Sequence, residues 1–130
     1  MARYVRDKSL EELVREVGGH VGLNHIDYSR IKCVRSYGSK SKRVAARVHS
    51  GSRALWTGLG LKPHYVIEFV SEVFDSLSGD EKLEVILHEL LHIPRMMGGG
   101  LVGHGRLDFK GEVRHLLGRL RSQGFNLLSR

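Results

Sequence analysis

Three ionisable side chains stand at a metal-binding spacing inside an otherwise apolar stretch. His88 and His92 are four positions apart, and Glu89 follows the first of them in the run H-E-L-L-H. In a helix, positions i and i+4 lie one turn apart on one face, so both imidazoles can reach one Zn²⁺ at about 2.0–2.1 Å. Glu89 lies about 100° around the helix, where it can take a proton from zinc-bound water and return it to a leaving amine. The spacing therefore predicts a zinc site with Glu89 as general base.

A catalytic zinc needs a third protein ligand and an open fourth position. His104 lies 12 residues beyond the motif's second histidine, across a glycine-rich loop that can reverse the chain. Glu112 lies 20 residues beyond it, on the last predicted helix, and His115 and Asp108 are weaker candidates. We expect His104 to complete the zinc site, with Glu112 as the alternative.

The surroundings of the motif favour a metal over a purely structural role. Its polar side chains interrupt an apolar helical stretch from Leu83 to Leu91, where an unpaired polar group costs about 1–3 kcal/mol. One metal ion would satisfy all three groups together. The alternative interpretation has both histidines hydrogen-bonded in the core and Glu89 in a buried ion pair.

Capping residues and hydrophobic spacing predict the helices. Ser78 and Glu81 form a capping box that begins the motif helix, and Pro94 ends it near His92 or Ile93. A last helix is expected over about 108–122 from its apolar spacing.

The N-terminal part of the chain predicts another helix and a sheet. The spacing of Ser9 and Glu12 indicates a second capping box, and the helix that it begins should stop at Gly18-Gly19. Alternating apolar and basic residues predict strands within 31–56, and a β-branched stretch predicts another at 64–70. We expect an α+β fold, with a small antiparallel or mixed sheet packed on the buried motif helix between N-terminal and C-terminal helices.

Length and charge restrict the possible functions. The chain has 130 residues, a formal net charge of +7 and one cysteine, which fits a single domain over 1–130 without a disulfide framework. No apolar run reaches the roughly 18 residues that span a bilayer, and signal-peptide features are missing, so we expect a cytoplasmic protein with no membrane contact. Nine basic residues and no acidic one lie between Tyr28 and Val66. This favours an anionic partner, nucleic acid first, through the region 30–62.

The motif and the residues after it resemble a known family. The run from His88 to Pro94 reads H-E-L-L-H-I-P, and it continues into G-G-G-L and then into Gly103-His104. This pattern is similar to the zinc metallopeptidases of archaea and phages, and the likeness covers about residues 44–120. The resemblance implies a zincin-like core, a zinc ion and hydrolysis of peptide bonds. It also implies His88, His92 and His104 as ligands and Glu89 as base.

A more distant likeness is to the SprT-like proteases, which cleave proteins bound to DNA. In that family the third histidine is followed by glycine and, three residues later, by an aromatic residue. Here Phe109 follows His104-Gly105 one position late, and the accessory zinc-binding cysteines are missing. Because of these differences, the likeness does not predict DNA-linked substrates for this protein.

The leading hypothesis is a zinc-dependent peptidase that acts on peptide or protein substrates. The alternative is a basic nucleic-acid-binding protein with a structural or degenerate zinc site, or a protease that nucleic acid recruits. A metal-dependent nuclease is a third possibility, because zinc can also activate water against phosphate. Hydrolysis of a peptide also needs a donor for the developing oxyanion, and Tyr65, His115, Arg114 and Arg106 are candidates.

Overall fold

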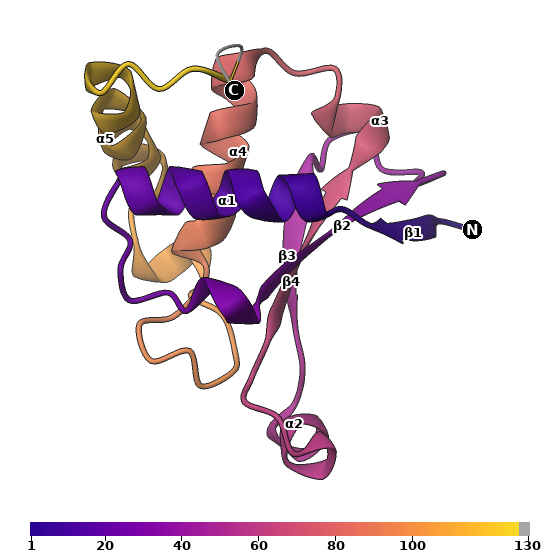
Figure 1. The fold of residues 1–130 in the computed structure, drawn as a ribbon. Coiled ribbons are helices and arrows are strands. Elements are labelled where there is room, and N and C mark those ends of the chain that lie inside the picture. The colour runs from indigo at the N-terminus through magenta and orange to yellow at the C-terminus, as the bar shows by residue number, and fades with distance from the viewer. Residues whose placement is uncertain (128–130) are drawn as a thin grey trace.

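The computed structural model describes residues 1–127 and shows an α+β fold built on one mixed sheet (Figure 1). Its strands run in the order β1-β2-β4-β3. Strands β2 and β4 are parallel, whereas β1 and β3 run antiparallel to their neighbours at the two edges. The strands are β1 (Arg3–Arg6), β2 (Ile31–Tyr37), β3 (Ala46–Ser50) and β4 (Tyr65–Val70). The predicted α+β class with a small mixed sheet is confirmed.

Five helices accompany the sheet in the described part of the chain: α1 (Lys8–His20), α2 (Arg53–Leu59), α3 (Ser71–Phe74), α4 (Gly79–Leu91) and α5 (Phe109–Ser122). Helices α1, α4 and α5 contact one another beside the sheet, and α2 projects away from them at the far end of β3 and β4 (Figure 1). Single 3-10 turns cover Tyr28–Arg30 and His104–Arg106.

The core lies between the sheet and the helices α1 and α4. Alternate side chains of β4 point into it, and Tyr65, Ile67 and Phe69 are fully buried. They pack with apolar residues of the two helices, among them Val17 and Leu87, in one hydrophobic cluster. Because α4 is fixed against the sheet in this way, the polar side chains on its remaining surface are held at defined positions.

The opposite side of β4 carries a buried carboxylate. Glu68 accepts a hydrogen bond from His49 Nε2 at 2.8 Å and forms an ion pair with Arg47 at 3.2 Å. Burial raises the pKa of Glu68, but Ser36, His49 and Arg47 together outweigh burial and leave that pKa below its usual value. The positive charge of Arg47 on β3 is thus neutralised by the carboxylate of Glu68 on the neighbouring strand β4.

Helix α1 differs from its prediction at both ends. It begins at Lys8, because Asp7 rather than Ser9 caps it and accepts the Leu10 N–H. It continues through Gly18, where the chain packs so tightly that a Cβ would stand 1.8 Å from the Tyr28 hydroxyl oxygen. The glycine pair does not end the helix, and at Gly18 it permits a close tertiary contact.

Three helices or strands were not predicted. Strand β1 and the short helix α3 were missed, and residues expected to end a strand near Trp56 form α2 instead. Ser52 caps α2 by accepting the Leu55 N–H. The Trp56 ring packs near His64, with ring centroids 5.8 Å apart, and its Nε1–H donates to the Gly51 carbonyl.

Within residues 1–127, no helix is both long enough and apolar enough to cross a membrane. That residues 1–130 form a single domain stays a prediction, and the last three of them lie outside the described residues.

Candidate metal centre

Helix α4 positions the three residues of the motif near its C-terminal end. The predicted capping box is present, because Ser78 and Glu81 exchange side-chain and backbone hydrogen bonds. The helix ends at Leu91, as Pro94 predicted, with His92 as its C-cap. His88 and His92 are half-buried, whereas Glu89 is only 6% exposed.

The loop after α4 returns His104 to the two motif histidines. Two hydrogen bonds join residue 102 to the end of the helix. The Val102 N–H donates to the His92 carbonyl at 2.7 Å, and His92 Nδ1 stands 2.6 Å from the Val102 carbonyl oxygen. Because Val102 lies two residues before His104, this pairing fixes the chain that carries the third imidazole.

Buried groups anchor the same loop to the rest of the fold. The Gly99 N–H donates to the Tyr65 hydroxyl at 2.9 Å, and Arg30 donates to the Met97 carbonyl at 3.3 Å. Met97 is fully buried, and its sulfur accepts the Asp27 N–H. The glycine-rich segment therefore has a defined path. Of the expected oxyanion donors, Tyr65 holds this loop, which agrees with its burial in the sheet.

The three imidazoles converge at distances that suit a metal ion. His88 Nε2 lies 3.1 Å from His104 Nε2 and 3.2 Å from His92 Nε2. Three nitrogen ligands at about 2.0–2.1 Å from a tetrahedral zinc stand about 3.3 Å apart. Since the Val102 carbonyl can only accept, His92 carries its proton on Nδ1 and directs the Nε2 lone pair toward the other rings. Together the three residues can hold a metal ion.

Two pKa shifts describe the electrostatics of this cluster. Burial, and then the neighbouring His92 and His104 rings, lower the pKa of His88, which favours the neutral ring that binds metals. Burial raises the pKa of Glu89 to about 8. No hydrogen bond or ion pair reaches the Glu89 carboxylate from the described residues, so nothing compensates its burial. A divalent cation beside it would supply that compensation.

Phe109 supports the cluster and was not recognised in this role from the sequence. Its ring centroid lies 5.0, 4.5 and 5.0 Å from those of His88, His92 and His104. Its position at the start of α5, directly after the Asp108 cap, brings the aromatic ring under all three imidazoles. The only signal in the sequence was an aromatic residue shortly after His104.

The other candidates for metal binding lie elsewhere. Glu112 is exposed in the first turn of α5 and is not part of the histidine cluster. Asp108 caps α5 by accepting the Gly111 N–H at 3.1 Å. His115 is exposed on the same helix. Among these residues and His104, the structure therefore brings only His104 to the motif.

A cleft of about 1110 Å³ opens beside the cluster, and His88, Glu89 and His104 line it. It runs between α4 and α5 and is bounded on one side by residues 43–46, which lead into β3. Arg114 is the one expected oxyanion donor in its lining, because Arg106 and His115 lie outside it. The cleft therefore connects the candidate metal centre with a cationic side chain of α5.

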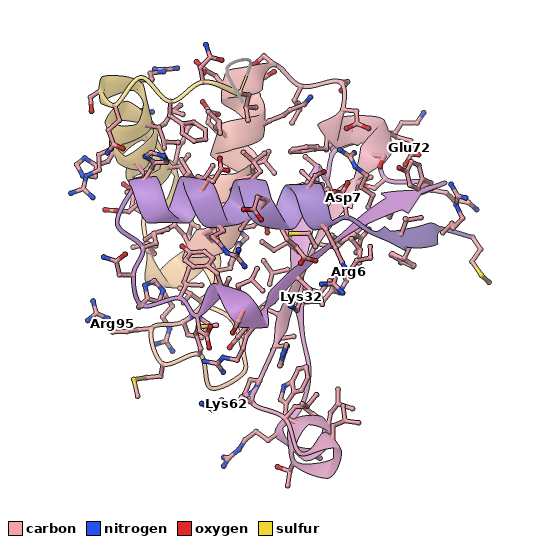
Figure 2. All side chains as sticks on the ribbon, viewed as in Figure 1. Arg6, Asp7, Lys32, Lys62, Glu72 and Arg95 are labelled. Atoms are coloured by element: carbon pink, nitrogen blue, oxygen red, sulfur yellow. The ribbon has the colours of Figure 1, made fainter. Side chains whose placement is uncertain are left out.

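The basic region 30–62 is partly neutralised by the fold. Arg30 pairs with Asp27, and Arg35 pairs with both Asp7 and Asp75. The Arg47 pair described above removes a third positive charge. Others remain on the surface: Figure 2 shows Lys32 on β2 and Lys62 on the segment between α2 and β4. A nucleic-acid partner stays a prediction that the fold and the comparisons do not support.

An α+β fold that gathers three histidines and a buried carboxylate beside a cleft has the features of a metal-dependent hydrolase. The model of the family described as "Putative phage metallopeptidase" matches residues 2–125. The chain belongs to this family, which confirms the resemblance to phage metallopeptidases. No curated protein and no solved structure gives a significant match to the chain.

Proposed function

We propose that the protein is a zinc-dependent peptidase in which His88, His92 and His104 hold the zinc and Glu89 is the general base. The convergence of three imidazoles carries this proposal, because their ligand nitrogens all lie within 4.8 Å of one another. Two further observations support it, namely the uncompensated burial of Glu89 and the family match. The likeness to zincins, the choice of zinc and the role of each residue are part of the proposal.

The chain's own groups have separate tasks in the reaction. The Val102 carbonyl orients the His92 ring, and Phe109 packs under the three imidazoles. Zinc, when bound, would polarise the scissile carbonyl and lower the pKa of a water molecule toward about 7. The Glu89 carboxylate accepts a proton from the attacking water and returns it to the leaving amine as the C–N bond breaks. Arg114 lines the cleft and adds positive charge to the wall that a bound substrate would face.

The sheet offers a docking edge for an extended substrate. Strand β3 is the last strand in the order β1-β2-β4-β3, so one of its edges has no partner strand among the described residues. The segment that leads into β3 also lines the cleft with the histidines. A peptide that adds to this edge would run past the candidate metal centre, and main-chain hydrogen bonds would hold it.

The proposal is tested by measuring metal content and proteolysis together. The purified protein should hold about one zinc per chain, and a chelator should remove both zinc and activity. Glu89→Gln should retain zinc and lose at least a hundredfold in kcat, because general-base catalysis contributes about 10²–10⁴-fold. A chain that neither contains nor binds zinc would contradict the proposal.

The third ligand is tested with a matched pair of variants. His104→Ala should weaken zinc binding strongly, whereas Glu112→Ala, at the rival position on α5, should leave zinc binding unchanged. The reverse result would exclude His104 as a ligand and reinstate Glu112.

A further inference from the structure

The cleft beside the candidate metal centre has an apolar floor. It extends from His88 and Glu89 along the groove between α4 and α5. Helical spacing explains why both helices contribute, since Val85 lies one turn before Glu89, and Val113 lies one turn after Phe109. The apolar lining includes Val44, Ala46, Val73, Val85, Val113 and Leu117. A large apolar side chain next to the scissile bond would be buried there.

At the end of the cleft farthest from the histidines, charged residues are already engaged. Arg121 of α5 pairs with Asp80 of α4. The Glu81 carboxylate accepts the Ser78 N–H in the capping box of α4 at 2.9 Å. The charges of these groups are therefore already balanced or bound within the fold.

Nearer the histidines, the charge of the cleft is positive. Lys110 and Arg114 of α5 line the cleft there and are exposed, and neither makes an ion pair within residues 1–127. Arg43, on the segment that leads into β3, is a further exposed lining residue without an ion pair in that part of the chain. Apart from Glu89, the only acidic side chain in the lining without a structural partner there is Glu84. Three exposed cations without ion pairs therefore outnumber Glu84, the one exposed carboxylate of the lining without a structural partner in residues 1–127, so the rim attracts anionic groups.

The spacing along α5 places this charge relative to the reacting bond. Lys110 and Arg114 follow Phe109, which contacts all three imidazoles, by one and five residues. At about 1.5 Å per residue, Arg114 lies roughly 7 Å along the helix from Phe109. An extended peptide advances about 3.3 Å per residue. Arg114 is thus reached by a residue two or three positions from the scissile bond, and Lys110 lies nearer to that bond.

We propose, on the basis of the proposed peptidase function, that the cleft selects acidic polypeptide segments. In these segments a large apolar side chain flanks the scissile bond and fills the groove between α4 and α5. A glutamate or aspartate lies two or three positions away, and Arg114, with Lys110 one helical turn before it, holds its carboxylate. The class of substrate is therefore an acidic, apolar-anchored peptide rather than a basic one.

Binding is measured first, because it does not depend on turnover. Fluorescein-labelled nonapeptides with a central leucine carry glutamate, glutamine or lysine two or three positions away on either side. They are titrated into zinc-loaded Glu89→Gln protein and followed by fluorescence anisotropy. We expect the best glutamate peptide to bind about tenfold more tightly than its lysine counterpart, with glutamine between them and the difference shrinking at high salt.

Two sets of variants assign the selectivity to named residues. Lys110→Glu combined with Arg114→Glu should reverse the order and favour the lysine peptide. Arg95→Glu is the matched control, because Arg95 is exposed on the loop after α4 and does not line the cleft (Figure 2). Val85→Phe should reduce binding of the central-leucine peptide about fivefold and spare a central-alanine peptide.

The outcomes separate this inference from the proposed function. Equal binding of the three peptides, no binding, or a preference that survives in the Lys110–Arg114 double variant would overturn the inference. Selective binding supports it even if the zinc-loaded wild-type protein cleaves none of the peptides, a result that would contradict the peptidase function alone. Cleavage of all three peptides at equal rates would support the peptidase function and contradict the inferred selectivity.

Discussion

Tyr65→Phe tests how the fold positions the third histidine. The substitution keeps the buried ring and removes the hydroxyl that accepts the Gly99 N–H at 2.9 Å. Losing one such hydrogen bond costs about 1 kcal/mol. Because Gly99 belongs to the loop that returns His104 to α4, we expect the loss to fall on the zinc-binding conformation. Zinc should then bind about fivefold more weakly, since 1.4 kcal/mol corresponds to a factor of ten.

The assay is competition for zinc with a chromophoric chelator, together with urea unfolding of the metal-free protein. Tyr28→Phe is the matched control, because it also removes one hydroxyl, which donates to the Leu23 carbonyl at 3.0 Å in a different loop. Tyr28→Phe should lose about 1 kcal/mol of stability with no change in zinc affinity, whereas Tyr65→Phe should lose affinity for zinc. Unchanged zinc affinity in Tyr65→Phe, or equal weakening in both variants, would refute the role of this anchor.

Four further predictions concern the rest of the fold. Gly18→Ala should destabilise the protein by about 1–2 kcal/mol in urea unfolding, since overpacking against Tyr28 outweighs the gain in helix propensity. Gly19→Ala, which meets nothing within 4 Å, should stabilise it by about 0.5–1 kcal/mol. The pKa of Glu68 lies below its usual value of 4.5, so its contribution to stability is present above that pH and is lost as the pH falls through the lowered pKa. Glu68→Gln should therefore flatten the acid limb of a plot of unfolding midpoint against pH, and an unchanged limb would contradict this. Burial raises the pKa of Cys33 to about 12, so an alkylating reagent at pH 8 should modify it only after unfolding, as mass spectrometry would show.

The elements that local sequence determines were predicted well. A capping box and a following proline define α4, and both signals lie within a few residues of the helix ends. The periodicity that puts His88 and His92 on one helical face is equally local. For that reason the first half of the candidate site could be placed before the fold was known.

The elements without a buried face were missed. All four residues of β1 are exposed, and no residue of α2 is buried, so neither segment carries the hydrophobic period that identifies a strand or helix. The end of α1 was wrong for a related reason. Gly18 lies inside the helix because Tyr28 packs against it and leaves no room for a side chain. This contact comes from the tertiary fold and not from the local pattern of the helix.

The second half of the site depends on contacts that no local pattern encodes. His104 reaches the motif because Val102 pairs with His92 and because Tyr65 holds Gly99. Phe109 reaches the imidazoles because α5 packs against α4. Sequence spacing could rank His104 above Glu112, but only the tertiary arrangement separates the two positions.

The strand order has a consequence for how the chain folds. Strand β4 comes last of the strands in the sequence, yet it inserts between β2 and β3, and its pairing with β2 joins residues 34 positions apart, such as Ile31 and Tyr65. Pairings this distant form late, because the intervening loop must close first. The tyrosine that begins β4 also holds the turn carrying the third imidazole. Under the proposed function, the three histidines would therefore converge only after β4 has paired with β2.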